Sequence, residues 1–257
     1  MNSLFSYLGL FFAGLIAAAV NSVAGGGTLI SFPSLVAFGE SEIVANATNT
    51  AAIWTGSLSG AIGYKKDTYV DRKLLITLLI PSVIGGFLGA FVLVITPELT
   101  FKRVVPFLVL FATVLFACRG VLSRRFRGNS NPEENVTTGR RIGGAFFQLF
   151  VATYGGYFGA GIGILMLASL SVMGLRDIHK INALKTPLGA VVNVTAFIFF
   201  AVKGLIAWPL AIVMVAGNVL GGYGGARLAK RVNQRRLEIG IIAIGLIVSG
   251  WLFILAL

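Results

Sequence analysis

The chain has 257 residues, of which 56% are hydrophobic and 12% are charged, and its mean hydropathy is +0.90. Water-soluble domains carry about twice this share of charged residues, so the composition excludes a soluble enzyme and indicates an integral membrane protein. The net charge of +12 would suit a nucleic-acid-binding protein. The basic residues, however, stand in short segments between apolar runs, where membrane topology explains them, and we expect no nucleic-acid partner.

The first apolar stretch, residues 3–38, carries no charge and is too long for one membrane crossing but too short for two. Near its middle stand a polar residue and three successive glycines, namely Asn21, Gly25, Gly26 and Gly27. Glycine lets the backbone turn without a Cβ clash, so the pattern predicts a break followed by a new helix that begins at Thr28. The free N–H groups of such a helix start attract anions, which makes the break a candidate site.

Six apolar runs of about 20 residues, each long enough to cross a hydrocarbon core of about 30 Å as a helix, follow along the chain. They are 43–64, 74–95, 101–118, 183–202, 208–226 and 237–257. A second long stretch without charge, 142–175, stands between the third and the fourth run. Its segment "YFGAGIGIL", which contains Gly161 and Gly163, predicts a second break whose helix start faces the first one near mid-membrane.

The distribution of Lys and Arg decides the topology. If both long stretches enter and leave on the same side, then 65–73, 119–141, 174–185 and 227–236 share one side, with 18 basic residues against 3. If each stretch crosses once, the division becomes 11 against 10. The positive-inside rule favours the first arrangement. We therefore expect two membrane-embedded helix hairpins, a cytoplasmic segment at 119–141 and both termini outside the cytoplasm.

The chain also matches itself at an offset of 136 residues. The matched groups are Gly25 and Gly27 with Gly161 and Gly163, Asn46 and Thr50 with Asn182 and Thr186, and "GGFLGA" with "GGYGGA". One offset that holds through three separate motifs indicates two homologous halves, 1–118 and 142–257, joined by the linker 119–141. We expect the two later glycine clusters to be packing surfaces between helices.

Each half would hold one glycine-broken hairpin and three membrane-spanning helices, which is an odd number of crossings, so the second half is inserted upside down. The expected fold is an all-α polytopic membrane protein built from two inverted-topology repeats, with eight to ten helical segments in all. Inverted repeats whose broken helices meet at the interface are typical of secondary transporters.

Polar residues follow each break on one face of the next helix. The spacing i, i+3, i+4 gives two equivalent sets, Asn46, Asn49 and Thr50 in the first half and Asn182, Lys185 and Thr186 in the second. Lys185 replaces Asn49 of the first half and brings a positive charge suited to an anion. These residues could instead form hydrogen bonds that hold the helices together, and Lys185 could extend to the cytoplasmic surface. Further candidates are Asn21, Tyr157 and Asn193.

All nine acidic residues stand in or beside predicted loops, so no carboxylate is available at mid-membrane for a proton relay. A proton-coupled mechanism would need the substrate, His179 or a carboxylate at the rim to carry the proton. The sequence contains no GxxxxGK[ST] phosphate loop, no His/Cys metal cluster and no nucleophile elbow. We therefore expect neither an enzyme nor a bound cofactor or metal.

The motifs "NSVAGGGTLISFPSL", "VANATNTAA", "INALKTPLGAVVN" and "WPLAIVMVAGNVLGGYGGARLAKRV" resemble those of the sulfite exporter TauE/SafE family over nearly the whole chain. The resemblance implies a transporter of the bacterial inner membrane for a small anion, chiefly sulfite or a sulfonate. The chain departs from the commoner family pattern with "GAGIG" in place of a second triple glycine and with Asn49 after Thr48.

Together these observations predict a secondary transporter that exports such an anion by alternating access between the two halves. Its expected partners are the anion and the lipid bilayer, and a homo-oligomer is left open. A passive anion channel and a membrane scaffold that transports nothing are the alternatives. Saturable exchange would favour a carrier, large single-channel currents a channel, and closure of the polar faces by apolar packing a scaffold.

Overall fold

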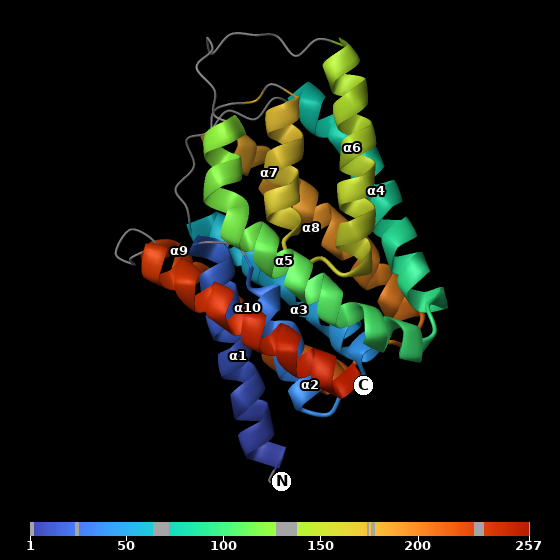
Figure 1. Cartoon of the computed structure of the whole chain (residues 1–257), viewed down its shortest axis with the longest axis vertical. Coiled ribbons are helices and arrows are strands. Elements are labelled where there is room, and N and C mark those ends of the chain that lie inside the picture. The colour runs from blue at the N-terminus through green and yellow to red at the C-terminus, as the bar shows by residue number, and fades with distance from the viewer. Residues whose placement is uncertain are drawn as a thin grey trace.

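The structure is a computed structural model that describes residues 3–23, 26–63, 72–126, 138–173, 175, 178–228 and 234–256. Within these ranges the chain forms ten α-helices and no strand (Figure 1). They are α1 (Ser3–Val23), α2 (Thr28–Ala37), α3 (Glu42–Gly63), α4 (Arg72–Ile95), α5 (Glu98–Phe126), α6 (Thr138–Tyr157), α7 (Ile162–Val172), α8 (Ile178–Val202), α9 (Trp208–Leu228) and α10 (Gln234–Ala256). The expected all-α class is confirmed, at the upper end of the predicted number of helical segments.

Six helices in the described part of the chain are long and apolar enough to cross a membrane. They contain Phe5–Ser22, Arg72–Ile95, Glu98–Cys118, Leu184–Val202, Trp208–Leu228 and Arg236–Ala256. Five of these correspond to predicted spans. The predicted span 43–64 falls on α3, which is not among the six, because its polar residues lower its hydropathy; α1 is among them instead. The molecule is therefore a multi-pass membrane protein, as its composition indicates.

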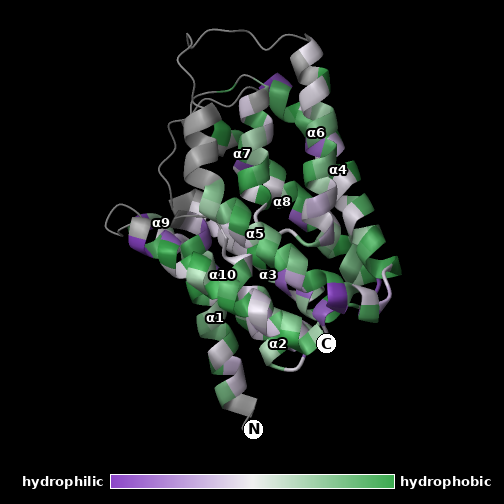
Figure 2. Ribbon diagram, viewed as in Figure 1, coloured by the Kyte–Doolittle hydropathy of each residue, from purple (hydrophilic) through white to green (hydrophobic). Residues whose placement is uncertain are grey.

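The outer surface carries large hydrophobic side chains that a protein in water would bury. Phe150 and Ile247 are each 71% exposed. Figure 2 shows hydrophobic residues along most of α4 and α10. Such surfaces are stable when they face lipid hydrocarbon, and they mark the part of the molecule that lies within the bilayer.

Both long charge-free stretches form a pair of unequal helices with a break at the glycines. The first pair is α1, with 21 residues, and α2, with 10; the second is α6, with 20, and α7, with 11. In Figure 1 the pair α1 and α2 occupies the lower end of the molecule, beside the N-terminus, and the pair α6 and α7 occupies the upper end. The two pairs thus reach the middle of the molecule from opposite ends.

Helix pairs between the two halves occur in matching sets. Helix α1 packs on α9 and α4 packs on α6, while α3 packs on α9 and α4 on α8. Two further pairs, α3 with α8 and α5 with α10, bring equivalent helices together. Exchanging α1–α5 for α6–α10 leaves this set of pairs unchanged. On this ground we propose that 1–118 and 142–257 are inverted repeats joined by 119–141.

The two later glycine clusters form close contacts between the halves. A Cβ added at Gly89 of α4 would overlap the carbonyl oxygen of Thr153 in α6, and one added at Gly221 of α9 would overlap the carbonyl oxygen of Leu15 in α1. Small residues let helix backbones approach closely in membranes, where no hydrophobic force drives the helices together. The predicted packing role of these motifs is confirmed.

Candidate functional site

The first break, between α1 and α2, needs glycine for two different reasons. Gly26 has a φ of +87°, in the left-handed region that side chains rarely adopt. Gly27 has a helical φ of −56°, but a Cβ there would overlap the carbonyl oxygen of Ala17 and lie 2.9 Å from the Cβ of Asn21. The chain therefore turns sharply and α2 returns against α1. Thr28, buried at 8% exposure, begins α2 as expected, and Gly25 lies outside the described residues.

Polar side chains around the first break bond to neighbouring helices. The Ser31 hydroxyl of α2 donates to Asn49 Oδ1 of α3 at 2.5 Å. The Asn21 amide of α1 donates to the Ser57 hydroxyl of α3 at 3.1 Å. The Thr50 hydroxyl donates to the backbone carbonyl of Asn46 within α3. In this half, Asn21 and Asn49 thus help to hold three helices together.

The second break, between α6 and α7, has two residues in the left-handed region. Gly159 has a φ of +78° and Gly161, which precedes the first residue of α7, has a φ of +77°. The Tyr154 hydroxyl donates to the carbonyl of Ala160 at 2.7 Å and ties the turn back to α6. The amides of Ile164 and Leu165 bond to the Gly161 carbonyl and start the new helix. The predicted break and helix start are both confirmed.

Helix α8 brings a cation and an amide to this second break. The Lys185 side chain passes Gly163 in the first turn of α7: its Cδ and Nζ lie 3.7 and 4.0 Å from the place a Cβ would take. The Asn193 Oδ1 lies 3.9 Å from the equivalent place at Gly159. Residues 185 and 193 are eight apart, so both lie on one face of α8. The positive charge predicted from the sequence therefore stands beside a helix N-terminus, where both favour an anion.

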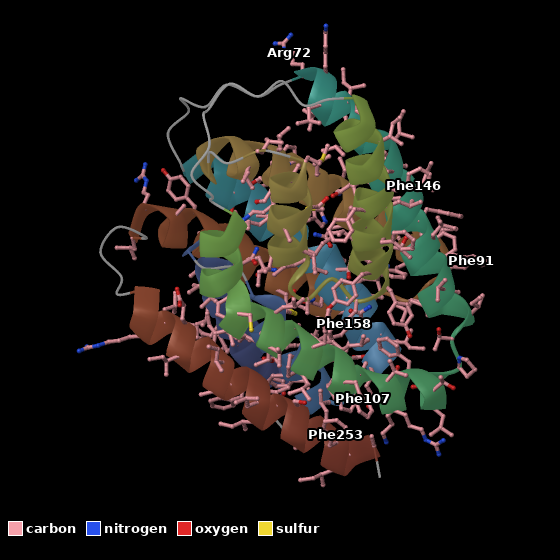
Figure 3. All side chains as sticks on the ribbon, turned by 45° about the horizontal axis from the view of Figure 1, so that its top comes forward. Arg72, Phe91, Phe107, Phe146, Phe158 and Phe253 are labelled. Atoms are coloured by element: carbon pink, nitrogen blue, oxygen red, sulfur yellow. The ribbon has the colours of Figure 1, made fainter. Side chains whose placement is uncertain are left out.

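The first half also contacts the second break. The Asn46 amide of α3 donates to the backbone carbonyl of Tyr157, the last residue of α6, at 2.9 Å. The ring of Phe32, in α2, meets the ring of Phe158 edge-on, with 5.3 Å between centroids. Figure 3 shows Phe158 inside the molecule, while Phe146 lies toward its outside. Helices from both halves therefore meet at the turn between α6 and α7.

Comparison with known proteins decides the family. Residues 10–252 match the family model described as "Sulfite exporter TauE/SafE". The chain belongs to this family. The expectation drawn from the sequence motifs is confirmed, and the match includes both breaks, all of α2 to α9 and most of α1 and α10.

Several curated TauE/SafE relatives are similar to most of this chain. A "Probable membrane transporter protein" of Haemophilus influenzae is 28% identical over 85% of this chain and 83% of its own length. "Probable membrane transporter protein YfcA" of Escherichia coli K12 is 29% identical over 94% and 87%. "Probable membrane transporter protein YunE" of Bacillus subtilis is 25% identical over 95% and 96%. No solved structure matches this TauE/SafE chain.

The structure brings some of the predicted site residues of this TauE/SafE protein together and leaves others apart. Around the second break stand Asn46, Tyr157, Gly161, Gly163, Lys185 and Asn193. Tyr157 contributes its backbone carbonyl, because its ring packs edge-on against Phe101. Thr186 lies next to Lys185 on α8 and is half-buried, while the side chain of Asn182 lies outside the described part of the chain.

Two serines that the sequence reasoning missed form hydrogen bonds with predicted site residues in the first half of this TauE/SafE protein. Ser31 holds Asn49, and Ser57 holds Asn21. The signal for Ser57 was present in the sequence, because Ser57 and Asn193 are related by the offset of 136 that relates the halves. Ser31 has Leu167 as its counterpart, so the offset gives no signal for it.

No group of three or more His, Cys, Asp or Glu residues that could hold a metal ion occurs in the part of the chain described here. The chemistry available at the second break is that of a hydrogen-bonding and electrostatic site. Its components are an ammonium group, side-chain amides, backbone carbonyls and the positive end of the α7 helix dipole, whose amides at Ile162, Ile164 and Leu165 already bond to the carbonyls of Gly159 and Gly161.

Proposed function

We propose that this TauE/SafE protein is a secondary transporter that exports a small anion, sulfite or an organosulfonate, by alternating access at the interface between its halves. The observation that carries the proposal is the position of the Lys185 side chain beside Gly163, in the first turn of α7. The relatives' names, all of probable membrane transporters, support transport. The family's description supports both a sulfur oxyanion and export.

Two electrostatic effects favour an anion at the second break: the charge of a helix N-terminus and the charge of the Lys185 ammonium group. A helix N-terminus carries a partial positive charge of about half an elementary charge. An ammonium group in a region of low dielectric constant loses hydration, and an anion beside it restores part of that loss. A sulfite or sulfonate group offers three oxygen acceptors, enough to bond to the ammonium group and to a second donor together.

The arrangement of the two hairpins supports alternating access. They reach the middle of the molecule from opposite ends, and packed glycine helices join each hairpin to the other half (Figure 1). Rocking of one repeat against the other can open a central site to each side of the membrane in turn. In this mechanism the site itself stays near the middle while its exits change.

Counterflow in proteoliposomes tests the proposed mechanism. Vesicles that contain the purified protein and are loaded with unlabelled sulfite are expected to accumulate labelled sulfite transiently, with a rate that saturates as the external concentration rises. A carrier produces this result because the loaded anion must leave before the labelled one enters through the same site. A linear rate together with large single-channel currents would identify a passive channel. If the vesicles show no flux of sulfite or of any other anion, the result would favour a scaffold.

We further propose that the protein lies in the bacterial inner membrane with both termini outside the cytoplasm and the linker 119–141 inside. The bias of 18 basic residues against 3 supports this orientation. Single cysteines introduced as Ser3→Cys and Ser130→Cys, in a Cys118→Ala background, test it. A membrane-impermeant maleimide is expected to label Ser3→Cys in intact spheroplasts and to label Ser130→Cys only after lysis. Labelling in the opposite order would reverse the orientation.

A further inference from the structure

One polar atom at the second break lacks a partner. Asn46 is completely buried, and its Oδ1 makes no hydrogen bond to any residue that the structure describes. The amide orientation is fixed, since only its Nδ2 can donate to the Tyr157 carbonyl, 2.9 Å away. An acceptor left without a donor in a buried place is costly. Asn218 in α9 also has unpaired amide atoms, but Asn46 differs from it because its amide lies at the break, on the side of the chain where Lys185 and the start of α7 stand, so a ligand there can supply the missing donor.

Two helix ends with opposite partial charges meet at the second break. The N-terminus of α7, with Lys185 beside Gly163, favours negative charge. The C-terminus of α6 ends at Tyr157 and favours positive charge or a hydrogen-bond donor. The carboxamide of Asn46 lies at this second end. A ligand that satisfies both ends carries an anionic group at one end and a donor at the other.

We propose that the site selects a monoanion that carries its own hydrogen-bond donor on a short arm, and that Asn46 Oδ1 accepts this donor. The inference rests on the proposed function and deepens it by assigning a part of the substrate to each end of the break. A hydroxyalkyl sulfonate, with one negative charge and one O–H donor, has the required chemistry. A single unpaired acceptor matches a single O–H or N–H group better than a metal cation, which needs several oxygen ligands at once.

Two probes of nearly equal size and equal charge isolate the donor. 2-Hydroxyethanesulfonate carries a terminal hydroxyl group where propane-1-sulfonate carries a methyl group. Calorimetric titration of the purified full chain is expected to show that the hydroxyl compound binds about fivefold to tenfold more tightly, the value of one additional hydrogen bond. Equal affinities in the unmodified protein would overturn the inference while leaving the proposed function intact. If sulfite and both sulfonates all fail to bind, the proposed function itself fails.

Variants assign the preference to one residue. Asn46→Leu is expected to remove the preference between the two probes and to retain affinity for propane-1-sulfonate, which also reports that the break is intact. Asn218→Leu is the matched control, because Asn218 of α9 is equally buried and both its amide atoms lack partners among the described residues. Asn218 packs against Gly56 of α3.

The control variant is expected to keep the preference of the unmodified protein. Loss of the preference in Asn218→Leu as well, or its persistence in Asn46→Leu, would overturn the assignment to Asn46. If Asn46→Leu does not fold, the comparison of the two probes on the unmodified protein still decides whether the site selects a donor.

Discussion

Replacement of Lys185 by alanine is expected to weaken binding of the transported anion by about tenfold to a hundredfold, the value of a hydrogen bond to a charged group. The side chain lies along Gly163 in the first turn of α7, so its removal takes away a full positive charge from the second break. The helix N-terminus remains, and we expect weak residual binding. Titration calorimetry with sulfite measures the affinity, and counterflow measures transport.

The controls for this variant separate charge from folding. Lys185→Arg keeps the charge and is expected to recover part of the affinity, although its planar head fits differently. Lys203→Ala removes an exposed ammonium group that lies 5.8 Å from the Phe199 ring centroid, at the far end of α8. This variant is expected to bind sulfite as the unmodified protein does. If Lys185→Ala binds with unchanged affinity and an unchanged thermal shift, Lys185 has no part in the site.

Most of the architecture could be predicted because a membrane leaves few choices. Apolar length and the absence of charge define candidate crossings, and the length and glycines of 3–38 and 142–175 predicted the pair of helices that each stretch forms. The glycine breaks could be predicted because glycine adopts positive φ at little cost, and Gly26 and Gly161 do have positive φ in the structure. Only α3 was misjudged as an apolar span, since polar residues that face the interior reduce its hydropathy.

The candidate site was harder to predict, because its contacts join residues far apart in the chain. Periodicity placed Asn46, Asn49 and Lys185 on helix faces but could not show what each face meets. The structure separates them: Asn49 bonds to Ser31 within its own half, whereas Asn46 reaches Tyr157, which is 111 residues away. The sequence suggested two equivalent breaks, and the structure shows two breaks with different side chains around them.

A few differences between the two proposed repeats account for this contrast between the breaks. Ser31 has Leu167 as its counterpart, and Asn49 has Lys185. In the first half, a serine and an asparagine form a neutral buried pair, which holds α2 against α3. In the second half, a leucine cannot make that bond, and the lysine extends instead along Gly163. The repeats therefore share a backbone plan, while we propose that the charge for anion binding comes from the second repeat.

The second large effect is expected from Gly89→Ala in α4, which tests how closely the two halves must approach. The new methyl group would overlap the Thr153 carbonyl oxygen and lie 2.6 Å from the Tyr157 nitrogen. Both are backbone atoms of α6 and cannot rotate away, so α4 and α6 must separate. We expect a loss of about 3 kcal/mol in the free energy of unfolding, at the upper end of the range for overpacking. Thermal unfolding in detergent should show a clearly lower midpoint.

Gly224→Ala is the matched control, since Gly224 belongs to the counterpart motif "GGYGGA" but no atom lies within 4 Å of the place its Cβ would take. Alanine favours a helix interior over glycine by about 0.5–1 kcal/mol, so this variant should unfold at an equal or higher temperature. Equal midpoints for the two variants would refute the close contact between α4 and α6. Because Tyr157 ends α6 at the break, Gly89→Ala should also weaken sulfite binding in the fraction that folds, whereas Gly224→Ala should not.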